Sequence, residues 1–228
     1  MKKYTVKQYQ SEDFGIWNEF VANAKNATFL FHRDFMEYHS DRFHDFSLLI
    51  FDEKQNLKAI LPANRVEETL FSHQGLTYGG LVLNQKTKLQ EVIEMVNGLL
   101  FFLDKNEITK LHLKQIPSIY SDFPSDEVDY LSFILNAKIV RKDSLSVIDL
   151  HSNYKFSNSR KQEINKGIKN NLVIREEENF GEFWNQVLIP NLKQKYNTNP
   201  VHSLEEIMGL KAKFPNNIRQ FNVYLNNK

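Results

Sequence analysis

A short aromatic motif that occurs twice constrains the fold of this chain more than any other feature. EDFGIWN at residues 12–18 is echoed, with one residue inserted, by ENFGEFWN at 178–185, and each copy follows a strand-like stretch. The two tryptophans of the chain, Trp17 and Trp184, hold equivalent places in the motif. A separation of about 166 residues fits an ordinary domain and is far too long for a solenoid repeat. The sequence therefore predicts two tandem copies of one fold.

The two copies are expected to differ in completeness. We predict a complete first domain over residues 1–154, a basic connecting helix over 155–170, and the start of a second, incomplete domain over 171–228. Residues 221–228 alternate like a strand and then read as a turn. We expect the strand that should pair with them to be missing.

The composition is that of a globular protein and excludes several kinds of site. Hydrophobic residues make up 41% of the chain and charged residues 25%, so no disordered class is implied. The chain has no cysteine, which rules out disulfides, thiolate metal sites and thiol nucleophiles. No signal peptide is recognisable and no apolar stretch approaches the ~20 residues that span a bilayer, so we expect a cytoplasmic protein. A net charge of +1 predicts no DNA partner, and any basic site must be local.

Hydrophobic periodicity predicts an α+β fold in which a mixed sheet is flanked by helices. Apolar residues at helical spacing over 89–103 give the most regular element, a long helix. Two apolar runs, 45–51 and 57–63, are joined by a polar turn and predict a β-hairpin. The order of elements then points to a mixed sheet. Further helices are expected over 14–24, 34–40 and 128–135, and further strands over 4–9, 108–114 and 145–150.

A glycine-bearing segment, residues 71–83, carries the clearest indication of chemistry. Gly79 and Gly80 are adjacent, and adjacent glycines let a backbone approach a ligand or let a strand bulge and aim its N–H groups outward. Acyl transfer needs such donors to stabilise an oxyanion. The alternative is that Gly75, Gly79 and Gly80 only serve turns at the rim of a sheet. The spacing matches neither a P-loop nor a Rossmann fingerprint.

A second candidate site is basic. Residues 155–169 contain five cations and one anion, and a capping box predicts a helix that begins at Ser159 with Ile164, Ile168 and Leu172 on its buried stripe. The exposed face is expected to contact phosphates of tRNA or of a nucleotide-linked substrate. A solvated face with no partner is the alternative. The proposed phosphate contacts are Arg160, Lys161, Lys166 and Lys169.

The histidines give no metal site, because their spacing does not match a His-x-x-x-His pair and no carboxylate completes a motif. His32 and Arg33 lie among aromatic residues and are candidates to line a pocket, with a plain core as the alternative. The acidic cluster at 126–129 reads as a helix start, with a general-base role as the less favoured alternative.

Three segments together resemble the FemAB family of tandem acyltransferases related to the GNAT fold. They are TFLF at 28–31, YGGLV at 78–82 before the long helix, and SRKQEINKGIK at 159–169 before a new strand. Family members that build peptidoglycan cross-bridges move an amino acid from aminoacyl-tRNA to an amine of a cell-wall precursor, and other relatives acylate sugars or small molecules. The resemblance implies a GNAT-like fold whose first copy is complete and whose second is truncated.

The resemblance implies an enzyme that transfers an acyl or aminoacyl group to an amine, from aminoacyl-tRNA or acyl-CoA, with no covalently bound cofactor. A noncatalytic ligand- or RNA-binding protein on the same fold is the alternative. The resemblance places the donor site in the second domain, whose later strands we expect this chain to lack, and a chain that binds without catalysing is therefore a further alternative. No general base is assigned. The expected substrate-binding residues are His32, Arg33, His73, Gln74, Tyr78, Gly79 and Gly80.

Overall fold

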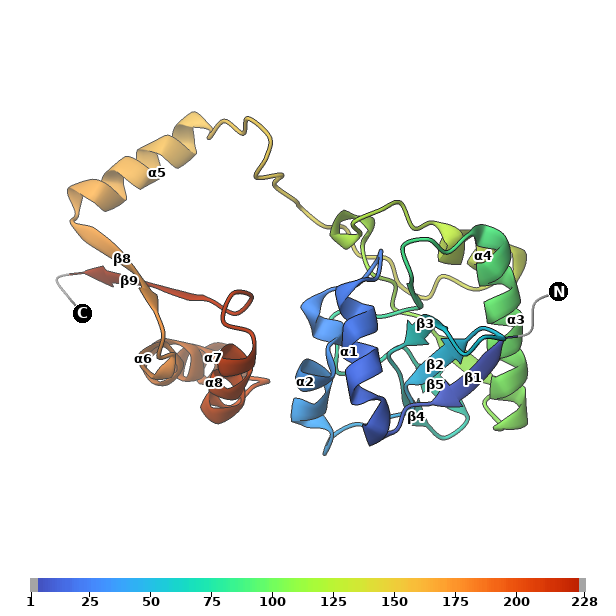
Figure 1. Ribbon diagram of the computed structural model, residues 1–228. Coiled ribbons are helices and arrows are strands. Elements are labelled where there is room, and N and C mark those ends of the chain that lie inside the picture. The colour runs from blue at the N-terminus through green and yellow to red at the C-terminus, as the bar shows by residue number, and fades with distance from the viewer. Residues whose placement is uncertain (1–3, 226–228) are drawn as a thin grey trace. The chain divides into compact units, whose positions relative to one another are not determined.

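The structure, a computed structural model, describes residues 4–225 (Figure 1). The chain divides into two compact units, residues 1–138 and 139–228. The boundary between the units lies before the predicted connecting helix. Residues 139–157, at the start of the second unit, contain no helix or strand. Within the described residues, no helix is long and apolar enough to cross a membrane.

The first unit is built on strands of mixed direction. An antiparallel sheet has the order β1 (Thr5–Gln8), β2 (Leu48–Phe51), β3 (Leu57–Leu61) and β6 (Val82–Leu83). A second sheet joins β4 (Asn64–Val66) antiparallel to β5 (Thr69–Phe71), which pairs in parallel with β7 (Lys110–His112). The predicted α+β class and mixed strand directions are confirmed. The predicted hairpin is β2 and β3.

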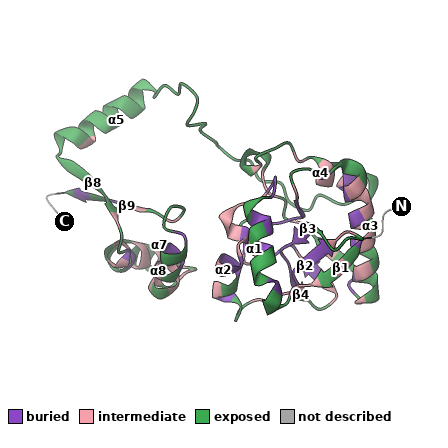
Figure 2. Ribbon diagram, in the orientation of Figure 1, coloured by how far each residue is buried: buried purple, intermediate pink, exposed green. Residues whose placement is uncertain are grey.

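Helices cover the first unit, and one of them supplies much of its core (Figure 2). The long helix α3 (Leu89–Lys105) buries Val92, Met95, Leu99 and Leu103, the stripe that its apolar spacing predicts. These side chains pack with apolar residues of β2 and β3 in one cluster. The other helices of this unit are α1 (Phe14–Ala22), α2 (Arg33–Met36) and α4 (Glu127–Ile134), with short 3₁₀ turns at Ser11–Asp13, Phe29–Phe31, Glu37–His39 and Ser118–Tyr120.

The second unit pairs two strands around a helical segment. β8 (Leu172–Glu177) and β9 (Gln220–Leu225) are antiparallel, from Leu172 opposite Leu225 to Glu177 opposite Gln220. The expectation that the terminal strand lacks a partner is therefore wrong, since β8 is that partner. The turn expected at 226–228 lies outside the described residues. Between the strands lie α6 (Gly181–Phe183), a π-helical turn (Trp184–Leu188), α7 (Ile189–Tyr196) and α8 (Leu204–Lys213).

The two units place their tryptophans in the same way. Trp17 lies in α1 and Trp184 begins the π-helical turn that follows α6, and each indole N–H donates to a backbone carbonyl: Trp17 to Phe31 at 2.8 Å and Trp184 to His202 at 3.2 Å. Phe31 lies one residue before the N-cap of α2, and His202 lies one residue before the N-cap of α8. In both units the strand that follows is antiparallel to the first. In each unit the motif is thus followed by helical segments and then by a strand antiparallel to the first.

Three predictions for residues of the second unit are wrong. Residues 145–150 form no strand, and Leu145, Val147 and Leu150 are exposed there, because no neighbouring strand accepts their hydrogen bonds. The basic helix α5 (Asn158–Lys169) is capped by Ser157, whose Oγ accepts from the N–H of Arg160, and not by Ser159. Its predicted buried stripe is exposed, as Figure 2 shows.

Candidate functional site

Gly79 holds two segments of the first unit close together. Its N–H donates to the carbonyl of Lys114 at 2.5 Å, in a parallel bridge between Gly79 and Gln115. A Cβ at Gly79 would lie 2.1 Å from the carbonyl oxygen of Ser72, so any side chain would collide with backbone. Glycine is needed here for close approach of the chain to itself. The Gly79 N–H, proposed from sequence to face a ligand, is used within the sheet.

The strands diverge directly after this bridge. β5 pairs with β7, whereas β6 pairs with β3, and the two residues between the bridge and β6 are Gly80 and Leu81. Gly80 has φ +97°, a conformation that favours glycine. Both residues are buried, and within residues 4–225 neither N–H donates a hydrogen bond. We call the N–H groups of Gly80 and Leu81 the diverging amides.

Asn26 fixes the chain on either side of the diverging amides. Its Nδ2 donates to the carbonyl of Leu81 at 2.9 Å, and its Oδ1 accepts from the N–H of Leu83 at 2.8 Å. The preceding residue, Lys25, donates its backbone N–H to the carbonyl of Leu83 at 2.9 Å. Asn26 is buried, so these bonds are shielded from water. Sequence reasoning missed Asn26, since nothing in the sequence distinguishes it from other loop asparagines.

Tyr78 lies beside the diverging amides in an aromatic setting. Its hydroxyl donates to Oγ1 of Thr28 at 3.0 Å, and its ring lies 5.8 Å from that of Phe31 and 5.4 Å from that of Tyr120. Burial raises the pKa of Tyr78, with the bond to Thr28 opposing the rise. The neutral hydroxyl is therefore the form present at neutral pH. Two segments that carry the family resemblance, 28–31 and 78–82, thus meet in space.

His73 is buried by packing, whereas Gln74 is exposed and held by hydrogen bonds. The His73 ring stacks on His39 with centroids 5.2 Å apart, and burial lowers the pKa of His73 to about 4. Gln74 exchanges two hydrogen bonds with Asn64, at 2.7 and 2.8 Å. A Cβ on Gly75 would lie 2.5 Å from Nε2 of His39. The contacts of His73 and Gln74 therefore fix the conformation of the segment that leads to Gly79.

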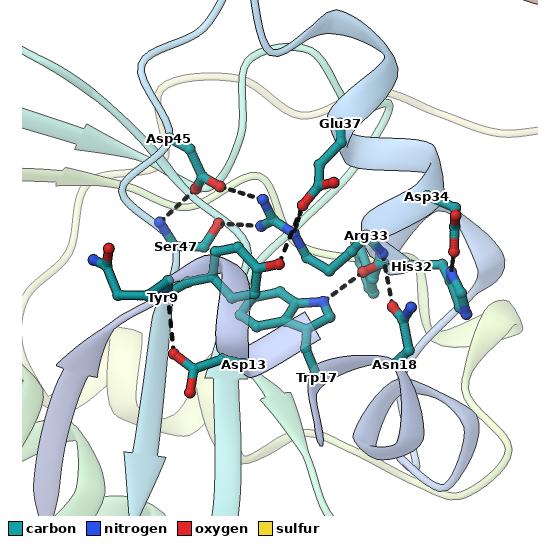
Figure 3. Close-up of polar contacts among 12 residues, drawn as sticks. Tyr9, Asp13, Trp17, Asn18, His32, Arg33, Asp34, Glu37, Asp45 and Ser47 are labelled. Carbon is teal, nitrogen blue, oxygen red and sulfur yellow. Dashed lines mark hydrogen bonds and ion pairs between the residues drawn. The ribbon is translucent and has the colours of Figure 1, made fainter. Parts of the chain in front are cut away.

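Arg33 is the centre of a separate buried network (Figure 3). Its guanidinium is paired with Asp45, donates to Glu37 at 3.1 Å and to Ser47 at 3.3 Å, and lies 3.7 Å from the centroid of the Tyr9 ring. Only 3% of Arg33 is exposed, so a ligand has no access to it in this conformation. Burial raises the pKa of Tyr9 to about 12, and Arg33 opposes the rise.

His32 is the more accessible neighbour. Its Nδ1 lies 2.9 Å from a carboxylate oxygen of Asp34, and about a third of its side chain is exposed (Figure 3). The structure therefore does not join the predicted residues in one site. Tyr78, Gly79 and Gly80 lie together beside the 28–31 turn, whereas Arg33 faces Asp45 and His73 faces His39.

The basic residues of α5 are all exposed, in the second unit. Arg160 is paired with Glu163 at 2.7 Å, which offsets part of its charge. Lys166 and Lys169 lie in the last turn of the helix, where cations are favourable in the field of the helix dipole. Within the described residues no group of three or more His, Asp or Glu side chains could hold a metal ion.

The acidic residues at the start of α4 border a shallow cavity of about 400 Å³. It is lined by Leu89, Pro124, Asp126, Glu127 and Tyr130. Glu127 is paired with the buried ammonium of Lys25, the residue next to Asn26. Sequence reasoning named the acidic cluster but not its buried partner.

Comparison with known proteins finds one remote structural similarity. No family model matches the chain, and no curated protein matches it. Among solved structures, it is similar to a GCN5-related glucosamine N-acetyltransferase region of a fungal multi-domain GH3 beta-N-acetylglucosaminidase, at 10% identity and a TM-score of 0.37. The match covers 100% of this chain and 26% of that one. A similarity of this size does not establish a common fold.

Proposed function

We propose that the protein is an N-acyltransferase of the FemAB or GNAT type, which moves an acyl or aminoacyl group from acyl-CoA or aminoacyl-tRNA to an amine. The observation that carries the proposal is the pair of diverging amides. Two consecutive buried N–H groups without an acceptor are costly unless something else accepts from them. A carbonyl oxygen that gains negative charge during acyl transfer is such an acceptor.

The chemistry required is the addition of an amine to an ester or thioester. The nitrogen lone pair attacks the carbonyl carbon, a C–N bond forms, and the carbonyl oxygen becomes an oxyanion that accepts from Gly80 and Leu81. The C–O or C–S bond then breaks, the amine loses a proton, and the leaving alkoxide or thiolate is protonated. Asn26 positions the amides by holding the Leu81 carbonyl. Donors fixed in advance cost no reorganisation during the reaction.

We further propose a tandem organisation, in which the second unit begins a second copy of the first. The matching bonds of Trp17 and Trp184 and the matching strand directions support it. The acceptor is an amine of a cell-wall, sugar or small-molecule substrate.

A side-chain series at Gly80 tests the proposed transfer. Gly80→Ala and Gly80→Leu share the strain of φ +97° and differ in the bulk placed beside the amides. We expect amide product, detected by mass spectrometry from acetyl-CoA or aminoacyl-tRNA and a panel of amines, to fall at least tenfold from Ala to Leu. Gly15→Leu, where a side chain meets open space, is the control. Equal activity of the two Gly80 variants, or no product from any donor and amine, would refute the proposal.

The exposed cations of α5 favour a second candidate function, noncatalytic binding of RNA or another phosphate-bearing ligand. Each phosphate contact adds about one unit to the log–log slope of affinity against salt. We expect tRNA binding to lose two to three units of slope when Lys161, Lys166 and Lys169 are changed to Glu. The matched control reverses three exposed lysines elsewhere, Lys54, Lys105 and Lys138. Equal slopes in both triple variants would remove α5 from any phosphate-binding role.

A further inference from the structure

A buried ion pair connects the cavity at the start of α4 to the diverging amides. The Lys25 ammonium, whose side chain is 4% exposed, is paired with Glu127, 102 positions along the chain. The second carboxylate oxygen of Glu127 accepts from Ser125 at 3.3 Å. The backbone of Lys25 is bonded to Leu83 and Asp122, and the next residue is Asn26. One short segment therefore carries both the ion pair beside the cavity and the clamp on the amides.

A buried ion pair of this kind is poor evidence for stability, since removing two charges from water offsets most of their attraction. Its structural effect is to fix the first turn of α4 against the loop that follows α1. α4 in turn packs against α3 (Figure 1), and Leu89 at the start of α3 forms the other side of the cavity. The pair also neutralises Glu127, which leaves Asp126 as the unneutralised charge in the lining.

The residues that line the cavity indicate the chemical class of its ligand. Leu89, Pro124 and Tyr130 offer apolar surface, and Asp126 makes no side-chain hydrogen bond at the helix N-cap position. Apolar walls with one free carboxylate suit a cation carried on a hydrocarbon body. The cavity is open to solvent, since Leu89, Asp126 and Tyr130 are all exposed, and its volume of about 400 Å³ is in the range of small-molecule sites.

We propose that this cavity binds the amine acceptor: a primary amine on an apolar skeleton, with its ammonium at Asp126 and its carbon chain against Leu89 and Tyr130. Glu127, which is held by Lys25, positions the first turn of α4 and with it the adjacent Asp126. The inference rests on the proposed acyl transfer for the fate of the amine, but its test measures binding alone. The site then favours aliphatic amines over sugars, whose hydroxyls would find few partners on the apolar walls.

The test is a protein-observed NMR titration of the whole chain with hexylamine, hexanol and hexanoate. We expect hexylamine to bind most tightly, hexanoate least, and the shifts to centre on Leu89 and Tyr130. Asp126→Asn should lower the preference for hexylamine over hexanol by about three- to tenfold, since the charge-assisted bond is lost at a partly exposed site. Asp129→Asn, an exposed acid of the same helix outside the lining, is the matched control.

The outcomes separate this inference from the proposed function. An unchanged preference in Asp126→Asn, tighter binding of hexanoate, or shifts centred elsewhere would overturn the cavity as an amine site, even if acyl transfer is observed. Amine binding that follows the expected order, without any acyl product, would keep the site and refute the transferase.

Discussion

At the scale of single residues, the first unit contains buried charged side chains that are paired with side chains of opposite charge. The Arg33 guanidinium is bound by Asp45, Glu37 and Ser47 and stacks on Tyr9 (Figure 3). A guanidinium fits this arrangement because its planar donors meet several acceptors while its face meets a ring. The sequence made Arg33 a candidate for a ligand contact. Its ion pair with Asp45 is a tertiary contact, which the spacing of the two residues in the sequence does not reveal.

Removing this cation should destabilise the first unit. Arg33→Met leaves Asp45 and Glu37 without their partner, and we expect a loss of about 3 kcal/mol in the free energy of unfolding. Arg42→Met, at an arginine whose side chain is 37% exposed and whose ion pair with Asp41 lies at the surface, should cost under about 1 kcal/mol. Urea denaturation of the two variants measures the difference. Equal losses would show that the Arg33 network does not stabilise the fold.

His73 makes the stability depend on pH. Burial first, and then the nearby His39, lower the pKa of His73 from 6.5 to about 4, with Asp45 opposing and Arg33 and Lys114 adding to the fall. The unfolded chain takes up a proton near pH 6.5 and the folded chain only near its pKa of about 4. Stability is therefore complete above pH 6.5 and falls on acidification towards pH 4, by roughly 3 kcal/mol.

The variant His73→Gln should flatten this acid limb, whereas His44→Gln, at an exposed histidine, should leave it unchanged. Chemical denaturation at several pH values between 4 and 7 provides the measurement. An identical acid limb in wild type and His73→Gln would mean that other groups cause it.

At the scale of elements, the arrangement around the diverging amides depends on adjacent glycines with different tasks. Gly79 allows contact with the backbone of Ser72, whereas Gly80 takes a positive φ and a Cβ there would make only an ordinary contact, 3.7 Å from the Cα of Gln115. The sequence predicted a close approach at these glycines but not which of the two uses its N–H in the sheet. That depends on the pairing with residues 114 and 115, far along the chain.

Alanine at the two positions should separate these tasks. Gly79→Ala drives a Cβ into the Ser72 carbonyl and should cost more than about 2 kcal/mol of stability. Gly80→Ala meets only the strain of its φ and should cost about 1 kcal/mol. Thermal unfolding of both variants checks the order. A larger loss for Gly80→Ala would contradict the geometry described.

Elements with a strong local signal were predictable, and elements that need a distant partner were not. The stripe of α3 and the turn between β2 and β3 are encoded within a few residues. The predicted cap of α5 was two residues too late, because serine is a favourable capping residue at both 157 and 159 and only Ser157, with its extended backbone, caps the helix. The alternation at 145–150 indicated a strand, but a strand also needs a neighbour, which sequence periodicity does not supply.

At the scale of the whole molecule, the two units differ in how much apolar surface they bury. The first has a continuous core around β2, β3 and α3. In the second, one face of the β8–β9 pair exposes Ile174, Phe221 and Val223, and α5 is exposed along its length (Figure 2). Regions with few buried contacts open at low free energy.

Hydrogen exchange should therefore rank the units. In a monomeric sample we expect amides of β2 and β3 to be the best protected, and those of α5 and β8 to exchange at least tenfold faster. Equal protection would show that something covers the second unit.

The proposed acyl transfer requires Gly80 and Leu81 to donate to the carbonyl oxygen of an acyl group. The most direct measurement is the ¹⁵N–¹H spectrum of the chain during titration with acetyl-CoA and, separately, with coenzyme A lacking the acetyl group. We predict downfield proton shifts of the Gly80 and Leu81 amides with acetyl-CoA that are absent with coenzyme A, because only the thioester offers the acceptor. If these two amides do not move, or move equally with both ligands, the acyl-transfer site is not at the diverging amides.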